Sequence, residues 1–146
     1  MKLKLPTESK ITLNLSIEED PQQEAYVIVR QATQREVERR AEVGSDASRI
    51  FREGDRSVEV RQKWNYEEQK RIEAYLTLVE CNLTVDFDGE DKPLFRFSRD
   101  ANGRMRVAMT EQQFKDAWGF LPENIAEAIH KAVIEVNPQW GPNAGE

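Results

Sequence analysis

The residues best suited to chemistry in this chain are Cys81 and His130, because a thiolate becomes a nucleophile when an imidazole lies close enough to take its proton. They are the only cysteine and the only histidine among the 146 residues. Cys81 follows Leu78 and Val79 in an amphipathic pattern where a small buried side chain fits. His130 lies on the flank of a second predicted helix. A serine triad would need the same histidine, and no G-x-S-x-G motif occurs. We therefore predict no catalytic residues and a protein that is not an enzyme.

Metal and cofactor sites are also not expected. The acidic run from Asp86 to Asp91 holds four carboxylates, but a calcium loop of the EF-hand type needs glycine at position six and glutamate at position twelve. Here Gly89 is fourth and Phe97 is twelfth, so a solvated turn is the better interpretation. No glycine-rich phosphate motif is present. A carboxylate pair for glycoside hydrolysis stays open, since any two of the 27 acidic residues could meet in a cleft.

Tryptophan and arginine are enriched at the energetic centres of protein interfaces. Trp140 lies in a segment with two prolines and two glycines, where a large aromatic side chain either anchors a partner or folds back over its own domain. We take Trp140, Trp118, Arg39 and Arg40 as candidate partner-binding residues.

Composition limits the class of protein. A length of 146 residues fits one domain, and 38% hydrophobic with 33% charged residues predicts a modest core under a charged surface. The net charge is −6, and the arginines between Arg30 and Arg71 are mixed with carboxylates. No unshielded basic patch for nucleic acid is expected. No apolar run has the length of a membrane span or a signal peptide, which predicts a cytoplasmic protein that does not contact membranes.

Two hairpins and an ambiguous segment account for the predicted strands. Alternation over 11–17 predicts a strand that pairs with a second one over 25–30. Short strands over 94–97 and 105–107 are expected to join through Asn102-Gly103. A third hairpin, over 48–52 and 57–64, is favoured by the alternation around Val58 and Val60.

Capping patterns and apolar spacing predict four helices. They are a helix from Thr33 to about Glu42, a long helix from Asn65 that carries Ile72, Tyr75, Leu76, Val79 and Leu83, a short helix from Thr110 to Gly119, and a helix from Pro122 to Val136. The predicted fold is α+β, with a small, mainly antiparallel sheet packed by three to four helices. A single domain is expected over 1–137, followed by a flexible tail over 138–146.

Several segments together resemble one family. They are Arg30-Gln31-Ala32-Thr33 leading into Glu36 and Arg39-Arg40, the long helix closing near Cys81-Asn82-Leu83, the acidic Asp-Gly turn, and the final Glu135-Val136-Asn137-Pro138-Gln139-Trp140-Gly141. With its length, the chain is similar to the tail assembly chaperones of long-tailed bacteriophages and prophages.

This resemblance implies a non-enzymatic protein of the bacterial host cytoplasm. Such a chaperone coats the tape-measure protein, keeps it soluble and recruits tail-tube subunits, and it could form a homo-oligomer. Two other classes stay open. A virion structural component, such as a tail or head–tail joining protein, would remain in the finished particle, and a small hydrolase would need a deep pocket with converging titratable groups.

Overall fold

A three-stranded antiparallel sheet forms the base of the molecule. The computed structural model describes residues 7–13, 24–48 and 56–141. In the sheet, β2 (Tyr26–Arg30) lies between β1 (Glu8–Thr12) and β3 (Leu78–Cys81), and Glu8 stands opposite Arg30. The predicted pairing of the first two strands is confirmed. The first strand begins earlier than its alternation indicated, and residues 14–17 of that prediction lie outside the described ranges.

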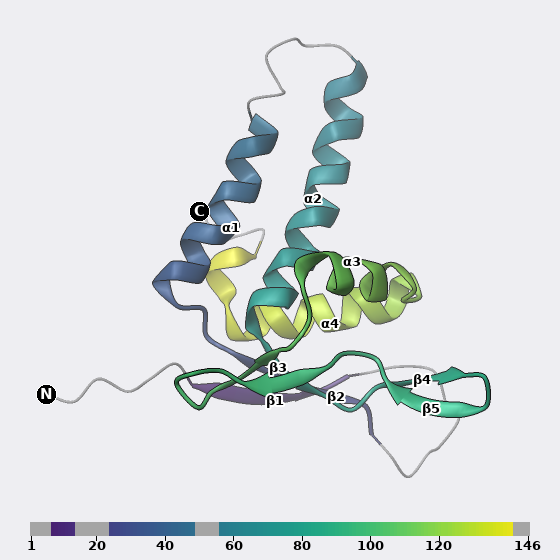
Figure 1. The fold of residues 1–146 in the computed structure, drawn as a ribbon. Coiled ribbons are helices and arrows are strands. Elements are labelled where there is room, and N and C mark those ends of the chain that lie inside the picture. Colours follow the sequence, from purple (N-terminus) through teal and green to yellow (C-terminus); the bar gives the residue numbers. More distant parts are fainter. Residues whose placement is uncertain (1–6, 14–23, 49–55, 142–146) are drawn as a thin grey trace, which may run out of the picture.

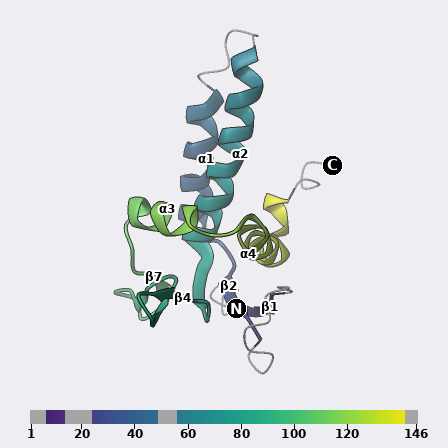
Figure 2. The same ribbon diagram turned by 90° about the vertical axis from the view of Figure 1, so that its right-hand side faces the viewer.

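Two long helices project from the sheet as an arm. Helices α1 (Gln34–Ser48) and α2 (Arg56–Thr77) stand side by side in both views (Figures 1 and 2). The hairpin predicted over 48–64 is wrong for 56–64, which belong to α2, and residues 49–55 are outside the described part. Arginine, glutamate, glutamine and lysine make up most of residues 56–63. Their helix propensity outweighs the short alternation of apolar and polar residues that favoured a strand. Asn65 consequently lies inside α2, and the helix start predicted there is wrong.

The helix predicted to carry Val79 and Leu83 is shorter than expected at its C-terminal end. It stops at Thr77, and the next four residues form β3 against β2. Leu78 and Val79 are buried there, and Cys81 stands opposite Val27. The spacing of apolar residues does not distinguish a continued helix from a strand at this point. Residues 78–81 form a strand because they pair with the central strand β2.

Two short hairpins extend from the sheet. Strands β4 (Thr84–Phe87) and β5 (Glu90–Pro93) meet at Asp88 and Gly89, whose φ angles of 54° and 84° are typical of a tight hairpin turn. The acidic turn is therefore part of a hairpin. Strands β6 (Phe97–Arg99) and β7 (Met105–Val107) form the second predicted hairpin, which is confirmed although β6 begins at Phe97.

The C-terminal helices lie between the arm and the sheet (Figure 1). Helix α3 (Glu111–Gly119) begins with the predicted capping box. The Thr110 hydroxyl accepts from the Gln113 N–H, and the Gln113 side chain accepts from the Thr110 N–H. The apolar spacing that predicted a helix from Pro122 to Val136 places one face of α4 (Glu123–Val136) against the sheet. The buried residues of that contact are Val27, Val29, Ile125, Ile129 and Val133.

The segment after α4 differs from the predicted loose tail. Pro138–Trp140 form a 3₁₀ turn, η1, and Trp140 is 8% exposed and packs in the core. Asn137 holds the chain there, because its Oδ1 accepts from the Ala32 N–H at 2.8 Å and its Nδ2 donates to the Arg30 carbonyl at 3.2 Å. The boundary predicted at 137 therefore falls inside the packed region, and residues 142–146 are outside the described ranges.

An aromatic cluster joins the helices to the β-rich part. Phe114 lies 4.8 Å from Phe95, 5.3 Å from Tyr75 and 5.8 Å from Trp118 between ring centroids. In the described ranges, four α-helices and three small antiparallel sheets make the fold α+β, as predicted. Over the described residues, no helix combines the length and the apolar composition that a membrane span requires.

Candidate functional site

The most deeply buried ion pair joins the end of β2 to the start of α1. The Arg30 guanidinium donates to both carboxylate oxygens of Glu36, at 2.5 and 2.6 Å, and also to the Leu76 carbonyl at 2.7 Å. Their side chains are 3% and 2% exposed. Among the described residues, the Arg30 Nε has no hydrogen-bond partner. Every other buried donor of the pair is used, which fixes the pair in place.

The predicted capping box at Thr33 is part of this arrangement. Glu36 accepts from the Thr33 N–H at 2.8 Å, and the Thr33 hydroxyl accepts from the Glu36 N–H at 3.4 Å. Burial by itself would raise the pKa of Glu36, but hydrogen bonds from Arg30 and Thr33 together with the Arg30 charge hold that pKa below its ordinary value of 4.5. Glu36 is therefore a buried carboxylate that stays ionised.

A second network connects four helical elements. Glu73 of α2 accepts from Arg40 Nε of α1 at 2.7 Å, and its other oxygen lies 2.6 Å from His130 Nε2 of α4. The Glu73 side chain is 3% exposed. The Arg40 guanidinium carbon also lies 5.4 Å from the ring centroid of Trp140 in η1. The network holds α1, α2, α4 and η1 together.

All four candidate partner-binding residues therefore make internal contacts. The structure brings Arg40 and Trp140 together in the second network. Arg39 donates to both carboxylate oxygens of Glu111 at 2.9 Å, which ties α1 to α3. Trp118 is half-buried; it stacks on Phe114 and also lines a surface cleft.

Cys81 and His130 lie on different elements, β3 and α4. Burial raises the pKa of the Cys81 thiol to about 11, the nearby Glu80 charge adds to the rise, and the Leu83 N–H opposes it. A thiol with that pKa is almost entirely protonated at neutral pH and is a poor nucleophile. The acidic turn is exposed, and within the described ranges no three His, Cys, Asp or Glu side chains are arranged to hold a metal ion.

A surface cleft lies where α2 meets α3 and α4. This cleft, the corner cleft, has a volume of about 380 Å³, and all its lining residues belong to these helices and the connection between α3 and α4. It is lined by Glu67, Lys70, Trp118, Leu121, Glu123, Ala126 and Glu127. Its apolar residues come from α3, α4 and the turn between them, and charged residues surround them.

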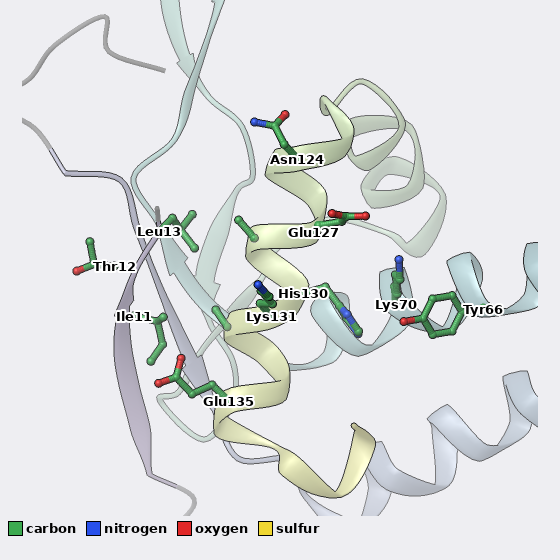
Figure 3. A pocket seen from close by; sticks show the side chains of 12 residues that line it. Ile11, Thr12, Leu13, Tyr66, Lys70, Asn124, Glu127, His130, Lys131 and Glu135 are labelled. Carbon is green, nitrogen blue, oxygen red and sulfur yellow. The ribbon is translucent and has the colours of Figure 1, made fainter. Parts of the chain in front are cut away.

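A second hollow of about 500 Å³ continues along α4 (Figure 3). Tyr66 and Lys70 of α2 lie on one side of α4, and Ile11 of β1 lies on the other (Figure 3). Lys70 and Glu127 line both hollows, so the two adjoin. We call the corner cleft and this second hollow together the α4 groove.

Charge in the α4 groove is unevenly balanced. Lys70 is already engaged, with its Nζ 3.3 Å from Glu67 Oε1 and 4.5 Å from the Tyr66 ring centroid. A stripe at intervals of four residues follows the exposed side of α4: Glu123, Glu127, Lys131 and Glu135. Within the described part of the chain, none of these four side chains forms an ion pair. Three carboxylates thus accompany one ammonium group, and the stripe carries a net negative charge.

Large apolar side chains are exposed beside this groove. Phe120, at the turn between α3 and α4, is 88% exposed and lies between the lining residues Trp118 and Leu121 in the chain. Tyr66 is 53% exposed at the α2 wall. Phe87 on β4 is also exposed, but it lines neither of the two hollows.

Sequence reasoning missed most of these residues. Glu73 carried a signal, because it stands between Ile72 and Ala74 inside an apolar pattern, where a carboxylate needs a buried partner. The Glu123, Glu127 and Glu135 spacing was readable as one helix face. Nothing in the sequence indicated that α2 would stand against this face.

Comparisons with protein-family models, with curated proteins and with solved structures found no match for the chain.

Proposed function

We propose that this chain is a non-enzymatic, protein-binding assembly factor. The observation that carries the proposal is the α4 groove, where half-buried Trp118 and exposed Phe120 accompany an open, charged cleft. Phe120 is 88% exposed, so covering its side chain with a partner would remove apolar surface from water and stabilise the complex. A polar rim around such anchors is the usual anatomy of a protein interface.

The interior supports the same proposal. Its buried titratable groups hold elements together: Glu36 of α1 pairs with Arg30 of β2, and Glu73 of α2 pairs with Arg40 of α1 and His130 of α4. Each of these charges is matched by a nearby partner and contributes to a rigid frame. The Cys81 thiol, with a pKa of about 11, is poorly suited to attack a substrate.

The more specific proposal is a tail assembly chaperone of a long-tailed phage or prophage, acting in the host cytoplasm. It rests on the resemblance of the segments around Arg30, Cys81 and Trp140 to that family. In this role the chain binds the tape-measure protein, keeps it soluble and recruits tail-tube subunits. The arm of α1 and α2 above the groove offers a long client a second wall to lie against.

Co-expression with the tape-measure protein of the same phage tests this function. We expect the tape-measure protein to be soluble and to co-purify with the chain, and to be lost to the insoluble fraction without it. Cys81→Ser and His130→Gln should both support tail assembly, because neither is assigned chemistry. A chain that never co-purifies with the tape-measure protein, or that remains in finished particles, would contradict the proposal; the second result would indicate a virion component.

A further inference from the structure

We infer that the α4 groove binds a basic amphipathic helix. This inference rests on the proposed function, and it names the binding site and the chemistry of the client segment. Four features of the molecule support it: the shape of the groove, the exposed aromatic groups, the excess of carboxylates along α4, and the helices that line the corner cleft.

The walls of the corner cleft favour a helix over an extended strand. The corner cleft is formed by α2, α3, α4 and the short turn before α4. The backbone groups of helix interiors are already hydrogen-bonded within each helix, so an added strand would find few main-chain partners there. A helix satisfies its own backbone and docks through side chains. The 14 residues of α4 offer it roughly 21 Å of length, about four turns.

The apolar contacts fit one face of such a helix. Trp118 and Leu121 line the corner cleft, and Tyr66 lines the second hollow farther along. Phe120, which lies between Trp118 and Leu121 in the chain, is exposed. Apolar side chains at intervals of three and four residues on a client helix would cover these groups in sequence.

The charges specify a basic client. Glu123, Glu127 and Glu135 have no ion-pair partner among the described residues, and Lys131 is the single ammonium group in their stripe. Lys70 is held by Glu67 and Tyr66. A client helix with lysine or arginine flanking its apolar face would find three open carboxylates, whereas an acidic helix would be repelled.

A pair of synthetic peptides tests the inference directly on the full chain. One is an 18-residue leucine/lysine amphipathic helix, and the other has every lysine replaced by glutamate. Fluorescence anisotropy of labelled peptide should show binding of the basic peptide, weakened at high salt, and at least about ten-fold weaker binding of the acidic one. Equal affinity for the two peptides would overturn the inference.

Matched variants locate the site. Glu127→Lys should weaken binding of the basic peptide about ten-fold, while Glu38→Lys, the same change on the exposed side of α1, should leave binding unchanged. Phe120→Ser should weaken it as well, and Phe87→Ser, at another exposed phenylalanine, should not. Urea midpoints of all four variants verify that they fold. If folded Glu127→Lys and Phe120→Ser bind like the parent, the groove is not the site.

The tape-measure protein separates the two proposals. Co-purification with the parent but not with Glu127→Lys supports both. Co-purification with both would overturn the groove and leave the chaperone function standing. Binding of the basic peptide, abolished by Glu127→Lys, together with no capture of the tape-measure protein would support the groove and contradict the chaperone function.

Discussion

At the scale of single residues, the buried Arg30–Glu36 ion pair should contribute strongly to the stability of the fold. Arg30 and Glu36 are almost fully buried, and they compensate each other at hydrogen-bond distance. Removing one member of a buried pair leaves the other as an unpaired ion, which is far more costly than losing an exposed pair.

Glu36→Gln should therefore be strongly destabilising. The amide cannot balance the Arg30 charge, and we expect a loss of about 3 kcal/mol in the free energy of unfolding. Urea denaturation followed by circular dichroism measures it. Glu38→Gln, on the exposed side of the same helix, should change that free energy by less than about 0.5 kcal/mol. Replacing both Arg30 and Glu36 by methionine should recover much of the loss; equal midpoints for parent and Glu36→Gln would refute the assignment.

The same carboxylate predicts a dependence of stability on pH. The pKa of Glu36 lies below 4.5 in the folded chain, so below that pH the unfolded chain binds more protons than the folded one. The contribution of Glu36 is complete above the unfolded value of about 4.5 and is lost as the pH falls through the lower, folded value. We expect the unfolding free energy to decrease from pH 5 downward. In Glu36→Gln this decrease should be shallower, although Asp100, whose pKa is also lowered by backbone hydrogen bonds from Arg104 and Asn102, keeps some of it. Urea titrations at several pH values compare the two slopes.

At the scale of elements, helix starts and strand pairing follow different rules. The two capping boxes, at Thr33 and Thr110, depend on residues three positions apart and form as the sequence predicts. The end of α2 depends on β2, which is about fifty residues away in the chain, and it could not be located from local spacing.

Thr110→Ala tests the capping of α3. The substitution leaves the Gln113 N–H without its acceptor, and we expect a loss of about 1 kcal/mol in unfolding free energy. Thr84→Ala, an exposed strand residue, provides the control. Thermal melts of both variants give the comparison. An unchanged melting temperature for Thr110→Ala would mean that water replaces the cap at no cost.

At the scale of the whole molecule, the C-terminal turn closes the core. Asn137 connects the end of α4 to the loop between β2 and α1, and Trp140 packs beneath Arg40. The last described turn is thus attached to elements from the first third of the chain. The sequence-based alternative in which Trp140 folds over its own domain agrees with this packing.

Trp140→Ala and Trp118→Ala should have different consequences. Trp140 is 8% exposed, so its removal opens a cavity and should cost about 3 to 5 kcal/mol. Trp118 is only half-buried and lines the corner cleft. Trp118→Ala should therefore destabilise the fold less than Trp140→Ala does, and it should weaken client binding more. Urea midpoints and peptide anisotropy are measured on both variants. A Trp140→Ala chain as stable as the parent would contradict the packing described for η1.

The sequence by itself determined the α+β class, the β1–β2 and β6–β7 hairpins, both capping boxes and the buried stripe of α4. All of these depend on residues close together in the chain, where spacing and hydrogen-bond chemistry are sufficient. Only the tertiary structure decided that residues 78–81 pair as a strand, that Trp140 is internal, and that α2 stands against the carboxylates of α4. The physical reason is that burial, pairing and charge balance at these positions depend on segments distant in sequence, whose approach local patterns do not encode.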